Sequence, residues 1–79
     1  MPTLLFVCTG NTCRSPMAEY IFRELTKDSE TDWQVKSAGI NSMPGMKASK
    51  EAVQALSEMD IDISRHKSAQ ISKQLLNSV

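Results

Sequence analysis

The most informative stretch of the sequence is Val7-Cys8-Thr9-Gly10-Asn11-Thr12-Cys13-Arg14-Ser15-Pro16. The almost continuously apolar run before it, residues 3–8, is typical of a buried parallel strand. Ser15 and Pro16 indicate a helix start, with Ser15 as the N-cap and Pro16 at the first helical position. The stretch therefore predicts a loop between the end of a strand and a helix N-terminus. Free backbone N–H groups and the helix dipole favour an anion there.

Cys8 and Arg14 frame this loop, with five residues between them. A loop of this length can hold the sulfur among backbone amides, with the guanidinium on one side. Such surroundings lower a cysteine pKa from about 8.5 to roughly 3.5–7.5, which predicts a thiolate at neutral pH. Arg14 also presents a planar fork that matches two phosphoryl oxygens. A nucleophile within a phosphate cradle predicts phosphoryl transfer; the alternative for Cys8 is a small core residue.

Composition argues against several classes of protein, namely nucleic-acid-binding, membrane-spanning, secreted and zinc-binding proteins. The chain has 79 residues, enough for one small domain, and nine basic and nine acidic residues give no bulk affinity for nucleic acid or membranes. No apolar run approaches the roughly 20 residues of a membrane span, and no signal-peptide pattern is present. Both cysteines lie in the loop, which suits a reducing cytoplasm. Cys8, Cys13 and the single His66 are too loosely spaced for a zinc site, and no cofactor is expected.

The middle of the chain shows helical and then strand patterning. Apolar residues from Ala18 to Leu25 recur at helical spacing, which predicts a helix to about Lys27 with one face on a sheet. Alternation over residues 33–36 predicts a second strand that ends at Ser37. A loop over residues 39–47 follows and would form a wall of the pocket.

The C-terminal part is predicted to be mostly helical. Residues 49–59 carry a helical period, Ile61 and Ile63 form a short extended piece, and Ser68 is a candidate N-cap for a short third helix. The helix would hold Ile71 and Leu75. The β-α-β-α-α order predicts a parallel sheet with helices on its faces. A sheet of two strands leaves an open edge that favours self-association.

The segment from Phe6 to Glu19, Phe-Val-Cys-Thr-Gly-Asn-Thr-Cys-Arg-Ser-Pro-Met-Ala-Glu, resembles the phosphate-binding loop and first helix of the low-molecular-weight protein tyrosine phosphatases. The resemblance continues through Ser37-Ala38-Gly39 and His66-Lys67-Ser68-Ala69-Gln70 and spans the chain. It implies an α/β fold, the N-terminal part of a flavodoxin-like or Rossmann-like three-layer fold with two of four parallel strands and three helices present. The family domain is roughly twice this length, so residues 1–79 would form a single, apparently truncated domain.

The resemblance also implies residue roles. Cys8 would be the nucleophile that forms a phosphocysteine, Arg14 would bind the phosphoryl group, and the Ser15 hydroxyl would donate to the sulfur. Cys13 would form a disulfide with the nucleophile under oxidation, the alternative being a packed free thiol. The remaining phosphoryl oxygens would be held by the loop residues Thr9, Gly10, Asn11, Thr12 and Cys13. The loop would be supported by Asn11, Ser37 and His66, although the latter two also fit an ordinary turn serine and a surface histidine.

The implied activity is dephosphorylation of a phosphorylated protein or a small phosphoester, inhibited by inorganic phosphate or vanadate. Thr12 matches the threonine that the bacterial protein arginine phosphatases of this family carry at the same loop position, whereas tyrosine-specific members generally carry isoleucine there. Residues 39–47 lack the aromatic residue of many phosphotyrosine clefts. Phosphoarginine and phosphotyrosine both remain open. No Asp-Pro occurs in the sequence, so the family's general-acid loop is absent, and its loss typically costs about 10²–10⁴-fold in rate.

Two other functions remain open. An arsenate reductase would use Cys8 on arsenate and relay a disulfide, but no cysteine follows Cys13, and Pro16 replaces the glutamine usual in that group. A non-catalytic oxyanion-binding fragment would need only the loop.

Overall fold

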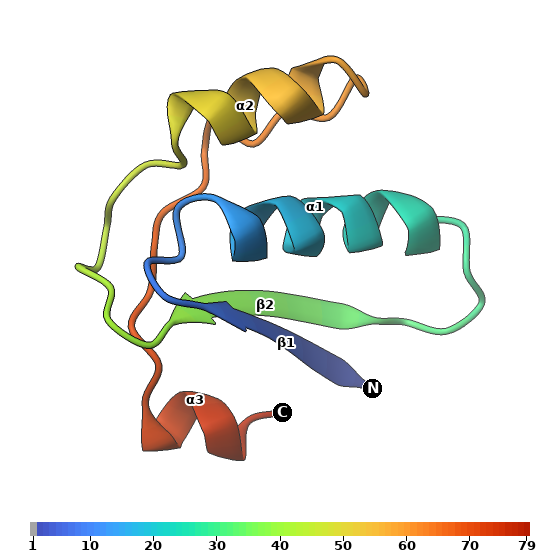
Figure 1. The fold of residues 1–79 in the computed structure, drawn as a ribbon. Helices are drawn as coiled ribbons and strands as arrows, with labels where there is room; N and C mark the ends of the chain where they lie inside the picture. Colours follow the sequence, from blue (N-terminus) through green and yellow to red (C-terminus); the bar gives the residue numbers. More distant parts are fainter. Residues whose placement is uncertain (1) are drawn as a thin grey trace.

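The structure, a computed structural model, describes residues 2–79. The elements follow the order β1 (Thr3–Cys8), α1 (Arg14–Thr26), β2 (Gln34–Gly39), α2 (Lys50–Ser57) and α3 (Lys73–Asn77), shown in Figure 1. This confirms the predicted α/β class and the β-α-β-α-α order. No helix within the described range is both long and apolar enough to cross a membrane.

The sheet consists of β1 and β2 in parallel, with register from Thr3↔Gln34 to Cys8↔Gly39. β2 starts one residue later and ends two residues later than residues 33–37, because its last residues still pair with Val7 and Cys8. The carboxyl ends of the two strands therefore lie side by side, and the loop after Cys8 begins beside Gly39.

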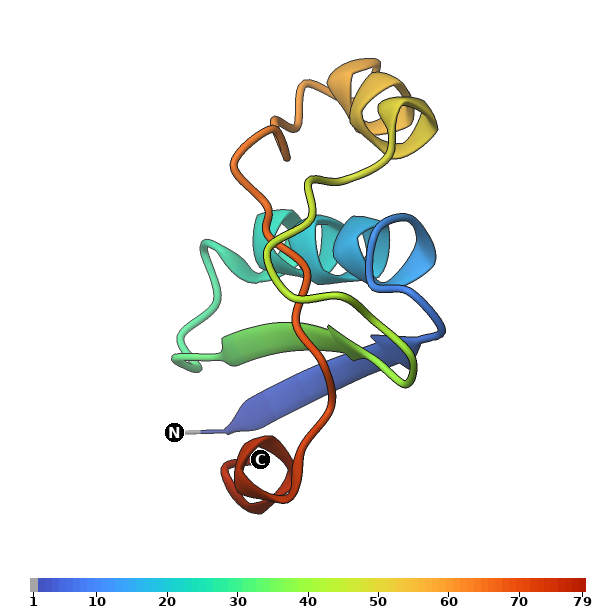
Figure 2. The ribbon, with the colours of Figure 1, turned by 90° about the vertical axis from the view of Figure 1, so that its left-hand side faces the viewer.

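Two of the three helices lie on opposite faces of the sheet as predicted, and α2 does not. α1 packs on the sheet, α2 packs on α1 and contacts neither strand, and α3 lies on the other side of the sheet (Figures 1 and 2). The reason is a buried apolar cluster between α1 and α2, against which Met17 and Ile21 of α1 also pack. The cluster consists of Ala52, Leu56, Ile61 and Ile63. The predicted extended piece at residues 61–63 thus serves the core and belongs to no strand.

The predicted sheet-facing side of α1 is only partly correct. Phe22 packs edge-on against Phe6 and Trp33, at ring-centroid distances of 6.1 and 5.2 Å. Leu25, by contrast, is 78% exposed. Ile21 faces the α2 cluster, because α2 supplies a second apolar neighbour for the helix.

Two predicted helix caps are wrong. The N-cap of α1 is Cys13, without a side-chain hydrogen bond, because the Ser15 hydroxyl is engaged inside the loop. The N-cap of α3 is Ser72, which accepts from the Leu75 N–H. Ser68 is buried and instead ties down residues 43–46, donating to the Met43 carbonyl (2.5 Å) and accepting from the Met46 N–H (2.8 Å).

Candidate active site

The loop of residues 9–13 joins Cys8, the last residue of β1, to the first turn of α1. Its bend depends on Asn11, whose φ of 58° is left-handed. Asparagine tolerates this conformation better than most residues with a side chain. Asn11 is also completely buried, so its side chain is fixed as part of the loop's interior.

The Cys8 sulfur is surrounded by hydrogen-bond donors. It lies 2.8 Å from the Ser15 hydroxyl oxygen and 3.2 Å from the Asn11 N–H nitrogen, which donates to it. Burial alone would raise the pKa of Cys8, but the Ser15 hydroxyl and the N–H groups of Ser15, Asn11 and Gly10 together bring the pKa below its ordinary value. The geometry therefore favours a thiolate at this position.

Asn11 also fixes the direction of the bond between Ser15 and the sulfur. Its side-chain Nδ2 donates to the Ser15 Oγ (2.7 Å), which occupies a lone pair of that oxygen. The Ser15 hydrogen is then free to point at the Cys8 Sγ. A donated hydrogen bond stabilises negative sulfur, and it would stabilise the same sulfur as a leaving group.

Segments distant in sequence hold Asn11 from the other side. Its Oδ1 accepts from the Ala69 N–H (2.8 Å), and its main-chain carbonyl lies 2.9 Å from the His66 Nε2. A carbonyl can only accept, so Nε2 carries the hydrogen and His66 acts as a donor to the loop. The structure thus brings together two of the predicted supporting residues, Asn11 and His66.

The carbonyls of the loop are tied down by two further elements. The residues that follow β2 supply the Ile40 N–H to the Cys8 carbonyl (2.8 Å) and the Asn41 N–H to the Thr9 carbonyl (2.9 Å). The start of α2 supplies the Ser49 N–H to the Thr12 carbonyl (2.7 Å). A Cβ on Gly39 would lie only 2.7 Å from the Thr9 carbonyl oxygen, so the absence of a side chain there permits this close approach.

Ser37, the third predicted supporting residue, bonds elsewhere. Its hydroxyl donates to the buried carboxylate of Glu19, which also pairs with Arg23 at 2.6 Å. The sequence predicts no role for Glu19 in the site, although its i,i+4 spacing to Arg23 indicates an ion pair along the helix. Tyr20, between these two residues in sequence, contacts His66 edge-on at 6.1 Å, so this cluster adjoins the loop support without a direct bond from Ser37 to Asn11.

The remaining predicted site residues occupy different environments. Arg14 is the first residue of α1 and is exposed, and its guanidinium forms no ion pair within residues 2–79. Cys13 is partly buried and packs against the α1–α2 cluster, and both cysteines are free thiols. Thr9 is exposed, whereas Gly10 and Thr12 are partly buried. In the described part of the chain, no three His, Cys, Asp or Glu residues are grouped to hold a metal ion.

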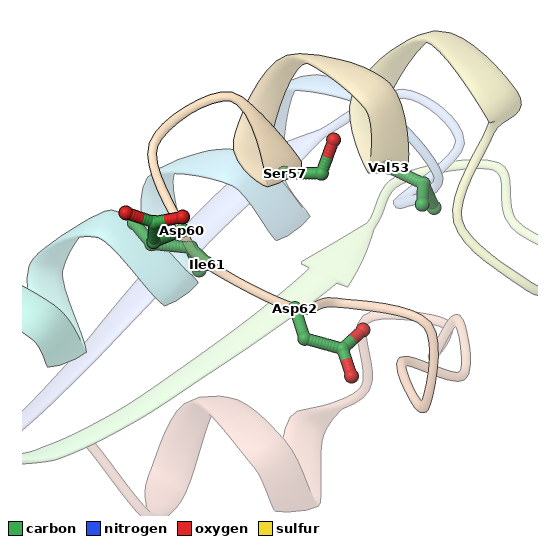
Figure 3. A pocket seen from close by; sticks show the side chains of 5 residues that line it. All are labelled: Val53, Ser57, Asp60, Ile61 and Asp62. Carbon is green, nitrogen blue, oxygen red and sulfur yellow. The ribbon is translucent and has the colours of Figure 1, made fainter.

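A cavity of about 240 Å³ lies apart from this loop, between α2 and the turn that follows it (Figure 3). Val53, Ser57 and Ile61 line it, together with Asp60 and Asp62, whose carboxylates point in different directions. No residue of the loop contributes to it, so this cavity is separate from the candidate site around Cys8.

Comparison with known proteins places this geometry in a family. The family model for low molecular weight phosphotyrosine protein phosphatase matches residues 3–79. The chain belongs to this family. Among its curated relatives, a protein-arginine-phosphatase of Bacillus subtilis is 43% identical over 75 residues, which is 95% of this chain and 49% of the relative. An arsenate reductase of Staphylococcus xylosus is 45% identical over 74 residues, covering 94% of this chain and 52% of the relative.

A solved structure of a family member supports the fold. The cysteine-to-serine mutant of YwlE arginine phosphatase, with a phosphorylated active-site serine, superposes with a TM-score of 0.92 at 40% identity. The match covers 98% of this chain and 50% of that one. This phosphatase-family chain therefore spans about half the length of the relatives it matches.

Proposed function

We propose that this chain carries the nucleophile and phosphate-binding loop of a protein phosphatase that acts on phosphoarginine, with phosphotyrosine as the second substrate class. The observation that supports it most directly is the donor set around the Cys8 sulfur, the Ser15 hydroxyl and the Asn11 N–H. Phosphoarginine is placed first for two reasons. Thr12 matches the threonine of the arginine phosphatases at this loop position, and the protein-arginine-phosphatase of Bacillus subtilis is 43% identical to this chain.

The reaction has two steps. The Cys8 thiolate attacks phosphorus, the S–P bond forms as the P–N or P–O bond breaks, and the leaving guanidine or phenol takes a proton from solvent. Water then attacks the phosphocysteine, the S–P bond breaks, and inorganic phosphate and the thiolate are released. In both steps the loop N–H groups and Arg14 would hold the phosphoryl oxygens, while the Ser15 hydroxyl stabilises the sulfur as attacking and leaving group.

Turnover depends on a group that protonates the leaving atom. Every Asp of this sequence lacks the following Pro of the family's general-acid loop. We therefore expect phosphorylation of Cys8 to be slow, because the leaving atom must take its proton from solvent, and release to be slow as well, because no positioned base activates the water; a missing acid or base of this kind typically costs about 10²–10⁴-fold in rate. Inorganic phosphate and vanadate would compete for the same cradle, and the free thiols suit a cytoplasmic location.

The test is a single turnover with a phosphoarginine peptide and, separately, a phosphotyrosine peptide. After rapid denaturation, intact-mass spectrometry should show one added phosphoryl group on the native chain and none on the Cys8→Ser variant. Cys13→Ser is the matched control and should still be labelled. Absence of label from both peptides, with the chain folded, would overturn the proposal.

Arsenate reduction is the second candidate, because the Staphylococcus xylosus arsenate reductase is 45% identical. Cys8 would attack arsenate by the same geometry, and Cys13 is the only other thiol in the sequence that could form a disulfide with it. Arsenate-dependent formation of a Cys8–Cys13 disulfide, read by thiol counting, would favour this function. The control is hydrogen peroxide in place of arsenate. A disulfide that forms with peroxide but not with arsenate would instead indicate oxidative protection of Cys8 by Cys13, which remains a prediction.

A further inference from the structure

A second cavity, of about 300 Å³ and more polar than the one beside α2, lies where α1, β2 and the segment of residues 65–69 meet. In Figure 2 this segment descends from α2 past α1 and the sheet toward α3. No residue of the Cys8 loop lines the cavity. Two buried side chains, Glu19 and His66, each 6% exposed, form part of its lining.

The lining carries a surplus of positive charge in a chain with no net charge. Glu19 is its one carboxylate, and both oxygens are already used, by Ser37 and by Arg23. Four of the nine cationic residues of the chain line the cavity, namely Arg23, Lys36, Arg65 and Lys67.

Three of these cations form no salt bridge in the described part of the chain. Within residues 2–79 no ion pair involves Lys36, Arg65 or Lys67, and the Lys36 ammonium donates a hydrogen bond to the Ser78 hydroxyl at 3.2 Å. Asp62 accepts a hydrogen bond from the Ser64 N–H, which lowers the pKa of Asp62; the charge of Arg65 lowers it further, although the two groups form no salt bridge. Unpaired cations around a concave site favour a ligand of opposite charge, and lysine and arginine bind phosphoryl oxygens through charge-assisted hydrogen bonds.

We propose that this cavity is a second anion site, which binds a phosphoryl dianion through Lys36, Arg65 and Lys67. It is separate from the loop of Cys8 and adjoins it through His66, because the ring that lines the cavity also donates to the Asn11 carbonyl. The phosphoryl group could come from free phosphate or from a second phosphorylated residue of a protein substrate. Both present the same negatively charged oxygens to the cationic side chains of the cavity.

The experiment is an NMR titration of the amide resonances with inorganic phosphate, using the native chain and two variants. The double variant Arg65→Gln/Lys67→Gln removes two cavity cations. Lys50→Gln/Lys73→Gln removes the same charge from exposed positions that do not line the cavity. Resonances of residues 9–15 report the proposed active site, and those of residues 35–37 and 65–69 report the second site, so each proposal can fail without the other.

Phosphate should shift both groups of resonances in the native chain and in the Lys50→Gln/Lys73→Gln control. In the Arg65→Gln/Lys67→Gln variant the affinity at residues 35–37 and 65–69 should fall at least about tenfold, which corresponds to roughly 1.4 kcal/mol. Shifts confined to residues 9–15, or an equal loss of affinity in the control, would overturn the second site. A phosphoserine peptide added to the Cys8→Ser variant distinguishes the sources: tighter binding than phosphate indicates substrate docking, and weaker binding indicates free phosphate.

Discussion

The loop after Cys8 and the strand that precedes it differ sharply in how they are held. Asn11 is fully buried, and donors from the turn after β2, from the N-cap of α2 and from residues 66–69 reach the loop. β1 is more apolar, yet none of its residues is buried, and Val7 is 43% exposed. One edge of β1 pairs with β2, and no other strand of the described chain pairs with it.

This difference shows that the shape of the site and the stability of the fold have separate sources. Polar contacts from several distant segments fix the loop, so its geometry does not depend on any single neighbour. Apolar burial is concentrated between α1 and α2, on the side of α1 away from the sheet. Core substitutions should therefore change global stability without changing the chemistry of Cys8, loop substitutions should change that chemistry as well as stability, and β1 substitutions should change association.

The largest effect on stability is expected from Leu56→Ala, because Leu56 is 1% exposed in the α1–α2 cluster. The free energy of unfolding in urea should fall by about 2–5 kcal/mol, enough to unfold a small domain. Leu25→Ala, at a position 78% exposed, is the control and should change it by less than about 0.5 kcal/mol. Equal losses would mean that the apolar core is not where the structure places it.

Asn11→Ala should affect both stability and chemistry. It leaves the Ala69 N–H without its acceptor and places alanine at a φ of 58°. We expect a loss of roughly 2–4 kcal/mol in urea unfolding, from the unpaired donor and the left-handed backbone. The pKa of Cys8, measured by the pH dependence of iodoacetamide alkylation, should rise. Asn41→Ala, at an exposed position, should leave both quantities unchanged.

Ser15→Ala isolates the hydrogen bond to the sulfur. The pKa of Cys8 should rise, because burial of the thiol remains while the donor at 2.8 Å is lost. Unfolding should change less than in Asn11→Ala, by about 1–2 kcal/mol. Ser42→Ala is a suitable control, since the Ser42 hydroxyl has no hydrogen-bond partner within residues 2–79. An unchanged alkylation profile in Ser15→Ala would remove Ser15 from the site.

The lowered pKa of Cys8 also predicts a small pH dependence of stability. Between the native pKa and the higher unfolded value, the unfolded chain binds more protons, so the free energy of unfolding should increase with pH. The contribution should be lost as the pH falls through the native pKa. Urea titrations across this interval should show a slope in the native chain that is absent from Cys8→Ser; a slope of opposite sign would contradict a stabilised thiolate.

The smallest effect on folding is expected at the open side of β1. Val7→Lys introduces a charge at a half-exposed position of an edge strand, which should suppress edge-to-edge pairing with little loss of stability. Sedimentation velocity over a range of concentrations should show less association than in the native chain. Leu76→Lys, on α3, is the control with similar exposure. An unchanged association constant would exclude this edge as the contact.

Local sequence determined much of the fold and the centre of the site. The strand of residues 3–8, the loop and the helix after it are neighbours in sequence, and their apolar periodicity and turn residues are local signals. For the same reason Cys8 and Arg14 could be placed at one strand-to-helix junction.

Only the tertiary structure decided what surrounds that junction. Serine is a residue type that commonly caps a helix, but the Ser15 hydroxyl instead lies against the Cys8 sulfur. Ala69 and Ser49 contribute backbone N–H groups, which every sequence carries and no sequence pattern marks. The α1–α2 core likewise depends on contacts between residues far apart in the chain. Periodicity and spacing describe neighbours along the chain, whereas the packing that aligns a donor with the thiolate is settled when distant segments meet.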